Sequence, residues 1–207
     1  MTNAPAFFAG FVLSATLIVA IGAQNTFVLR QGLRREHVGP IVLFCALADF
    51  TLMLAGVAGL GATLRRLSGL TAALAFGGAL FLAWYGVGAL RRALCPQGGL
   101  AADERGETLS LRVALARTAA FTLLNPHVYL DTVLLVGAVG AAQSSGGQPA
   151  FVAGAGLAST LWFATLGYGA RLLAPLFARP AAWRMLDAII GATMLAIAAG
   201  LAKHGLP

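Results

Sequence analysis

The 207 residues are 59% hydrophobic and only 10% charged, with 14 Lys and Arg against seven Asp and Glu, for a formal net charge of +7. A typical soluble domain has roughly 25% charged residues, so this composition excludes a soluble globule and a disordered nucleic-acid-binding tail. The basic residues lie in short clusters between long apolar runs, which is typical of the loops of a membrane protein. We therefore predict an all-α polytopic membrane protein.

The apolar runs predict six membrane-spanning helices, because about 20 apolar residues cross a bilayer. Long stretches of the chain hold at most one charged side chain each, and the longest of them, 118–170, is interrupted by the turn-forming sequence 143–149. The first run lacks the basic residues that open a signal peptide, so we expect it to remain in the protein. The predicted helices lie near residues 6–29, 40–62, 71–93, 113–140, 151–173 and 184–203.

A polar segment, residues 95–112, joins the third and fourth predicted helices and separates the units 1–94 and 113–207. The positive-inside rule places this segment in the cytoplasm and both chain termini outside. The side opposite the segment holds three basic residues, Arg65, Arg66 and Lys203. Its own side holds eleven, namely Arg30, Arg34, Arg35, Arg91, Arg92, Arg105, Arg112, Arg117, Arg171, Arg179 and Arg184.

The two units resemble each other in sequence. Identical residues recur in the same order, at offsets that drift from 100 to 110 to 113 along the chain. Because three helices per unit reverse the direction of the second unit, this pattern predicts two inverted three-helix repeats, as in many secondary transporters. Chance similarity in a chain rich in Gly, Ala and Leu is the alternative. The matches are Asn25 with Asn125, Leu47-Ala48 with Leu157-Ala158, and Gly78-Ala79 with Gly191-Ala192.

Two carboxylates lie well inside predicted helices, Asp49 in the second and Asp131 in the fourth. A carboxylate at the centre of a membrane helix costs about 2.5–3.5 kcal/mol on insertion scales, so it normally faces a partner or a wet cavity. No Lys or Arg lies within one helical turn of either residue, and His127 is a local candidate for a structural pair with Asp131. We favour a role in holding a cation or carrying protons over a purely structural role.

The dipeptide Asn125-Pro126 predicts a helix that begins inside the membrane, because asparagine is a preferred N-cap and proline is favoured at the first helical position. Such an N-terminus presents free N–H groups and positive dipole, which suit a carboxylate. In the first unit, the sequence Gly22-Ala23-Gln24-Asn25 offers a matching polar break. A kink filled by neighbouring side chains is the alternative interpretation.

No cofactor or metal is predicted. The sequence has no glycine-rich nucleotide loop, no His/Cys cluster at metal-ligand spacing and no Ser/His/Asp nucleophile elbow. Its two cysteines, Cys45 and Cys95, are too few for a disulfide framework.

Four segments resemble the LysE/ArgO family of amino-acid exporters: GAQNTFVLRQGLRREHV (22–38), ALAD (46–49), AWYGVGAL (83–90) and LLNPHVYLDTVLLVG (123–137). The resemblance covers nearly the whole chain in the same order, and the NPHVYLDT block is its most specific part. It implies export of basic amino acids such as arginine or lysine across the bacterial cytoplasmic membrane, driven by ion gradients. Carried over by position, it implies a functional core of Gln24, Asn25, Asp49, Asn125, Pro126 and Asp131.

The leading prediction is a secondary transporter that exports arginine or lysine, with Asp49 and Asp131 coupling export to protons. The expected partners are the amino acid, protons and membrane lipid, without nucleic acid, and self-association is left open. The alternatives within transport are an exporter of neutral amino acids or of a metal cation. From a different class, an intramembrane enzyme could use the two aspartates as an acid/base pair, whereas a structural subunit would have little use for buried carboxylates.

Overall fold

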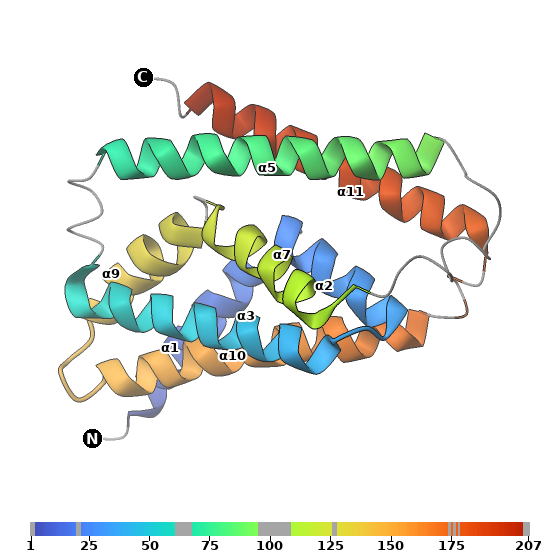
Figure 1. Ribbon diagram of the computed structural model, residues 1–207. Helices are drawn as coiled ribbons and strands as arrows, with labels where there is room; N and C mark the ends of the chain where they lie inside the picture. Colours follow the sequence, from blue (N-terminus) through green and yellow to red (C-terminus); the bar gives the residue numbers. More distant parts are fainter. Residues whose placement is uncertain are drawn as a thin grey trace.

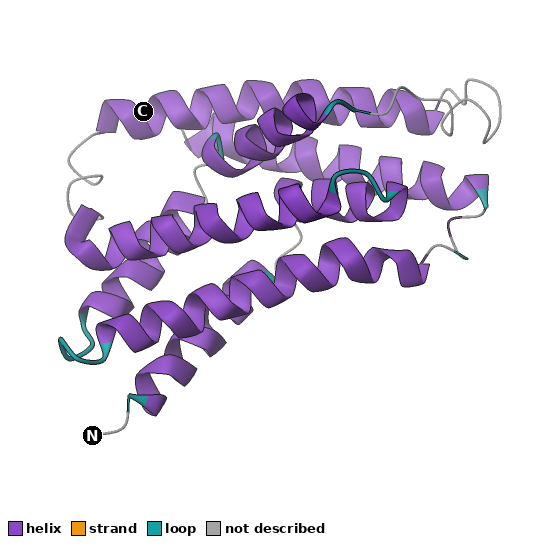
Figure 2. Ribbon diagram, turned by 60° about the horizontal axis from the view of Figure 1, so that its bottom comes forward, coloured by secondary structure: helices purple, strands orange, loops and turns teal. Residues whose placement is uncertain are grey.

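The computed structural model describes residues 3–19, 22–60, 68–94, 109–125, 128–173, 175, 177 and 179–204. Every regular element in these ranges is helical, so the predicted all-α class is confirmed (Figures 1 and 2). The helices are α1 (Ala4–Ile18), α2 (Ala23–Arg34), α3 (Val38–Ala55), η1 (Gly56–Leu60), α5 (Ser68–Leu94), α7 (Leu111–Leu123), η2 (Tyr129–Val136), α9 (Gly137–Ala141), α10 (Gln148–Gly169), η3 (Ala170–Leu173) and α11 (Pro180–His204).

Three of these helical stretches are long and apolar enough to cross a membrane: Val38–Gly59, Gln148–Leu173 and Ala181–Gly200. A fourth span results if α1 and α2 are counted together as one bent span. The chain is therefore a multi-pass membrane protein. The described residues account for three or four of the six predicted spans, and most of the predicted linker, residues 95–108, lies outside them.

The predicted helix over 6–29 is two helices, because the axes of α1 and α2 differ by 82°. The polar break expected near Gly22 is present: α2 begins directly after this residue, whose φ of −107° and ψ of 179° are extended. Both the backbone N–H and the hydroxyl of Thr26 donate to the Gly22 carbonyl, at 3.1 and 2.7 Å. These bonds fix where the new helix starts.

The predicted helix over 113–140 is also interrupted. Helix α7 ends at Leu123, and η2 begins at Tyr129 as a π-helix that continues into α9. The N–H of Val128 donates to the Asn125 carbonyl at 3.1 Å across the interruption. Pro126 and His127 lie outside the described residues, so the predicted role of Pro126 and the predicted pairing of His127 with Asp131 stay predictions.

An aromatic cluster joins α2, α5 and α7. The ring of Phe121 on α7 lies 5.2 Å from that of Phe27 on α2 and 4.8 Å from those of Phe81 and Tyr85 on α5. Aromatic pairs at such centroid distances contribute beyond the area that they bury. Helices α5 and α11 lie alongside each other at one edge of the bundle (Figure 1), and this cluster packs α5 against α2 and α7.

Helices α1 and α10 touch backbone to backbone. A Cβ atom on Gly10 would lie 2.1 Å from the Phe151 carbonyl oxygen, and one on Gly154 would lie 2.0 Å from the Phe7 carbonyl oxygen. Only glycine fits at such positions, and small residues that let backbones approach closely are typical of helix contacts in membranes. This reciprocal contact places the end of α1 beside the middle of α10.

The outward faces of the long helices are apolar, as expected for contact with lipid. On α3 the exposed residues follow helical spacing, as do those on α5. They are Leu43, Leu47, Phe50 and Leu54 on α3, and Phe76, Leu80, Trp84 and Val87 on α5.

Candidate functional site

A cavity of about 270 Å³ lies where the break between α1 and α2 faces α3 and η2. Its volume is close to the lower end of the range of about 300–1,000 Å³ that small-molecule sites occupy. Every described residue that the sequence predicted for the site lines it, and Pro126 lies outside the described residues. These five predicted residues are Gln24, Asn25, Asp49, Asn125 and Asp131.

Asp49 is buried on α3 and receives a hydrogen bond of 2.8 Å from the hydroxyl of Ser159 on α10. This neutral donor satisfies one carboxylate oxygen without cancelling its charge. A buried carboxylate without a cationic partner is costly, so a cation or a proton entering the cavity would stabilise it.

Asn25 is held in place from two sides. Its Nδ2 donates to the Ile18 carbonyl at 2.9 Å, and its Oδ1 accepts from the indole N–H of Trp162 at 3.3 Å. The first bond ties the start of α2 to the end of α1, and the second ties it to α10. Asn25 therefore fixes the geometry of the first break as well as lining the cavity.

Two buried polar atoms in the cavity wall have no hydrogen-bond partner among the described residues: Nε2 of Gln24 and Oγ of Ser14. The Gln24 side chain lies beside the Cys45 thiol, whose sulfur is a weak acceptor. Buried polar groups are nearly always hydrogen-bonded, so these two atoms, which belong to residues of the cavity wall, are candidates for binding a ligand there.

Asp131 also lines the cavity, in the first turn of η2, and is half-buried. The positive end of the η2 dipole already faces this carboxylate. π-helical turns occur often at functional sites because they redirect side chains within a helix. The two carboxylates, Asp49 and Asp131, thus enter the cavity from helices in different halves of the chain.

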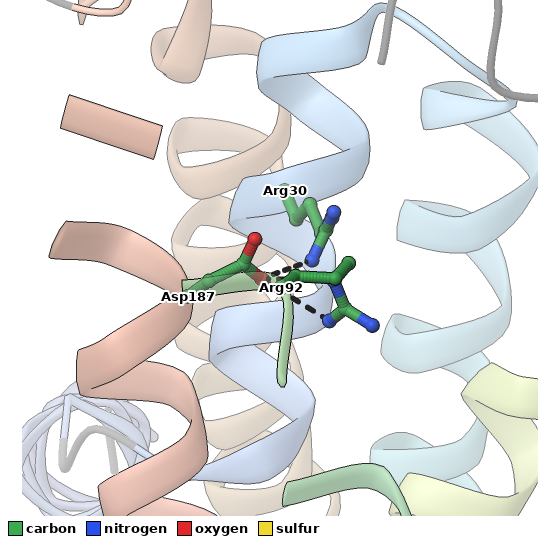
Figure 3. A network of polar contacts seen from close by, with 3 residues as sticks. All are labelled: Arg30, Arg92 and Asp187. Carbon is green, nitrogen blue, oxygen red and sulfur yellow. Dashed lines mark hydrogen bonds and ion pairs between the residues drawn. The ribbon is translucent and has the colours of Figure 1, made fainter. Parts of the chain in front are cut away.

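A second polar cluster lies away from the cavity lining (Figure 3). The carboxylate of Asp187 on α11 pairs with Arg30 on α2 at 2.5 Å and with Arg92 on α5 at 3.1 Å. Arg30 and Asp187 are buried, whereas the Arg92 side chain is 41% exposed. Arg30, which sequence reasoning treated only as a topology signal, is therefore also a buried structural contact between three helices.

Sequence reasoning missed Ser14, Ser159 and Asp187. Ser159 had a signal, since it lies 110 residues after Asp49, the offset at which the second helices of the two units match. Asp187 had none, because its partner Arg30 is 157 residues away. The structure also places Trp162 against Asn25.

A polar cavity with carboxylates, enclosed by broken membrane helices, defines a multi-pass membrane transporter. The family described as LysE type translocator matches residues 15–205, and the chain belongs to this family. It is therefore a transporter and not an enzyme, which excludes the intramembrane acid/base alternative.

Relatives match over nearly their full length. A Mycobacterium tuberculosis protein with the provisional name amino-acid transporter is 49% identical over 88% of this chain and 90% of its own. The arginine exporter ArgO of Yersinia enterocolitica is 40% identical over 97% of both chains. The ArgO of Salmonella enteritidis is 39% identical over 97% of this chain and 94% of its own. No solved structure matches the chain.

Proposed function

We propose that the protein exports basic amino acids, arginine foremost, from the cytoplasm in exchange for protons. The observation that carries this proposal is that Asp49 and Asp131 line one cavity whose described wall contains no Lys or Arg. Such a wall suits a ligand with two cationic groups. The names of the ArgO relatives, 38–40% identical over 96–97% of the chain, support arginine as that ligand.

The coupling follows from the charge of the substrate. Moving one positive charge out of a cell costs about 2.3 kcal/mol per 100 mV of inside-negative potential. At roughly 150 mV the cost is about 3.5 kcal/mol, equal to a several-hundred-fold concentration gradient at 1.4 kcal/mol per tenfold. A passive pathway would therefore import arginine. Export requires at least one proton to move inward for each amino acid.

Each of the two carboxylates can hold either a cationic group of the amino acid or a proton. When the amino acid leaves, Asp49 or Asp131 takes up a proton from outside in place of the cationic group that it held. Release of that proton to the cytoplasm restores the charged site. One proton per arginine makes the cycle electroneutral, and a second proton lets the membrane potential drive export.

We place this activity in a fold of six spans built as two inverted repeats, 1–94 and 113–207, in the bacterial inner membrane. The termini face outward and residues 95–112 face the cytoplasm. Two observations support the duplication. Asn25 and Asn125, 100 residues apart, line the same cavity. Asp49 and Ser159, 110 residues apart, are hydrogen-bonded to each other.

The test is reconstitution of the full chain in liposomes with an imposed pH gradient. Arginine and lysine flux against their own gradients is expected when protons flow in the opposite direction. Flux that is indifferent to the pH gradient and to proton ionophores would contradict proton exchange. The absence of flux for both amino acids would contradict the substrate.

A further inference from the structure

The N-terminus of α2 opens into the cavity. Its N-cap, Gly22, and the next residues Gln24 and Asn25 all line the cavity wall. No side chain among the described residues caps this end, and its first turn contains no acidic residue. The first N–H groups of a helix have no partner within the helix and carry the positive end of its dipole. This end of α2 is therefore suited to an anionic group.

Gln24 provides a second and independent indication. Its side chain is 8% exposed, and Nε2 has no hydrogen-bond partner in the described part of the chain. The hydroxyl of Ser14 on α1 also has no hydrogen-bond partner among the described residues, and Ser14 is 2% exposed. Both residues line the cavity, and both atoms can donate a hydrogen bond. A carboxylate, which only accepts, would satisfy them.

The second half-helix is less suited to an anion. Asp131 occupies the first turn of η2, so this end already faces a carboxylate and would repel another. The sequence alone suggested the Asn125-Pro126 end for a substrate carboxylate. The placement of Asp131 favours the α2 end instead.

We propose that the α-carboxylate of the transported amino acid binds the Gln24 amide and the open first turn of α2. This inference rests on the proposed function, since it takes the substrate to be an amino acid. The α-ammonium group then faces Asp49, which lies one helical turn after the Cys45 thiol beside Gln24. The cationic end of the side chain extends to Asp131. Gln24 is thus a specificity residue that selects amino acids over simple amines.

The experiment measures equilibrium binding of arginine and of agmatine to the purified full-length protein. Agmatine is arginine without its α-carboxylate. The wild type is expected to bind arginine about tenfold to a hundredfold more tightly, which is the typical range for a hydrogen bond to a charged group. Gln24→Leu should reduce this preference by weakening the binding of arginine while leaving that of agmatine unchanged, because only the first turn of α2 would still bind the carboxylate.

Two further variants keep the result interpretable. Gln31→Leu removes another buried amide of α2 that lies outside the cavity lining, and it should keep the wild-type preference. Gln24→Glu has nearly the same shape, replaces the amide with a carboxylate that would repel that of arginine, and should shift the preference toward agmatine.

The outcomes separate the two proposals. If the wild type does not bind arginine, the substrate in the proposed function is wrong. If it binds arginine and agmatine equally, or if Gln24→Leu weakens both ligands alike or leaves the preference intact, the carboxylate site is wrong while the proposed function stands.

Discussion

The two half-helices that border the cavity differ in how firmly they are held. Nine of the twelve residues of α2 are buried, whereas η2 has two buried residues, Val133 and Val136, among its eight. Helix α2 is tied to α1 and α10 through Asn25 and to α11 through the pair of Arg30 with Asp187, which also binds Arg92 on α5. The position 100 residues after Arg30 is Leu130, which is 50% exposed. The two breaks in the chain are thus followed by one anchored helix, α2, and one more peripheral helix, η2.

This difference suits different tasks. An anchored N-terminus presents its N–H groups in a constant position, as recognition of the invariant part of a substrate requires. A peripheral π-helix that carries Asp131 can adjust to the variable part of the substrate, its side chain. The predictions below test this assignment in order of decreasing effect.

The largest effect is expected from Asp187→Asn, which leaves Arg30 buried without a carboxylate. Breaking a buried pair by removing one partner costs about 3–5 kcal/mol, so thermal unfolding of the purified protein should shift strongly downward. Arg92→Gln, which removes the partly exposed partner, should cost under about 1 kcal/mol. If Asp187→Asn unfolds at the wild-type temperature, α2 is not anchored by this cluster.

Asp131→Asn should abolish arginine export, a loss of about a hundredfold or more, without loss of folded protein. Asparagine has nearly the same shape, removes the charge that holds a cation and lowers the cost of insertion. The measurement is arginine transport in proteoliposomes, scaled to the amount of protein. Asp49→Asn is expected to behave alike, and Glu36→Gln, outside the cavity lining, should transport normally. Wild-type transport by Asp131→Asn would return that carboxylate to a structural role.

The smallest effect is expected from Trp162→Phe, which keeps an aromatic ring but removes the N–H that donates to Asn25. A neutral hydrogen bond contributes about 0.5–1.5 kcal/mol, so the KM for arginine should rise several-fold. Trp84→Phe, at a residue that is 64% exposed, serves as the control and should have no effect. Equal behaviour of the two variants would show that the Trp162 bond does not position α2.

The sequence predicted the parts of this site that have local chemical signals. The segments Gly22-Ala23-Gln24-Asn25 and Asn125-Pro126 indicated the regions of the two breaks, because turn-forming and helix-capping residues are local signals within apolar runs. Asp49 and Asp131 were evident because charge is rare in apolar runs. The different packing of the two half-helices had no local signal, since the burial of Arg30 depends on Asp187 in the last helix. The sequence predicted six spans, whereas by length and composition the described helices provide three, or four if α1 and α2 form one bent span.

The backbone contact between α1 and α10 has a mechanical consequence. Gly10 and Gly154 each contact the backbone of the opposite helix, so no layer of side chains lies between α1 and α10 there that could change rotamer to accommodate sliding. Close-packed surfaces of this kind move as a unit because any shear opens a void or forces a clash. The two helices therefore form one rigid body that carries Ser14, Ser159 and Trp162 together. If the proposed export involves opening the cavity to each side of the membrane in turn, the remaining helices would have to move against this body.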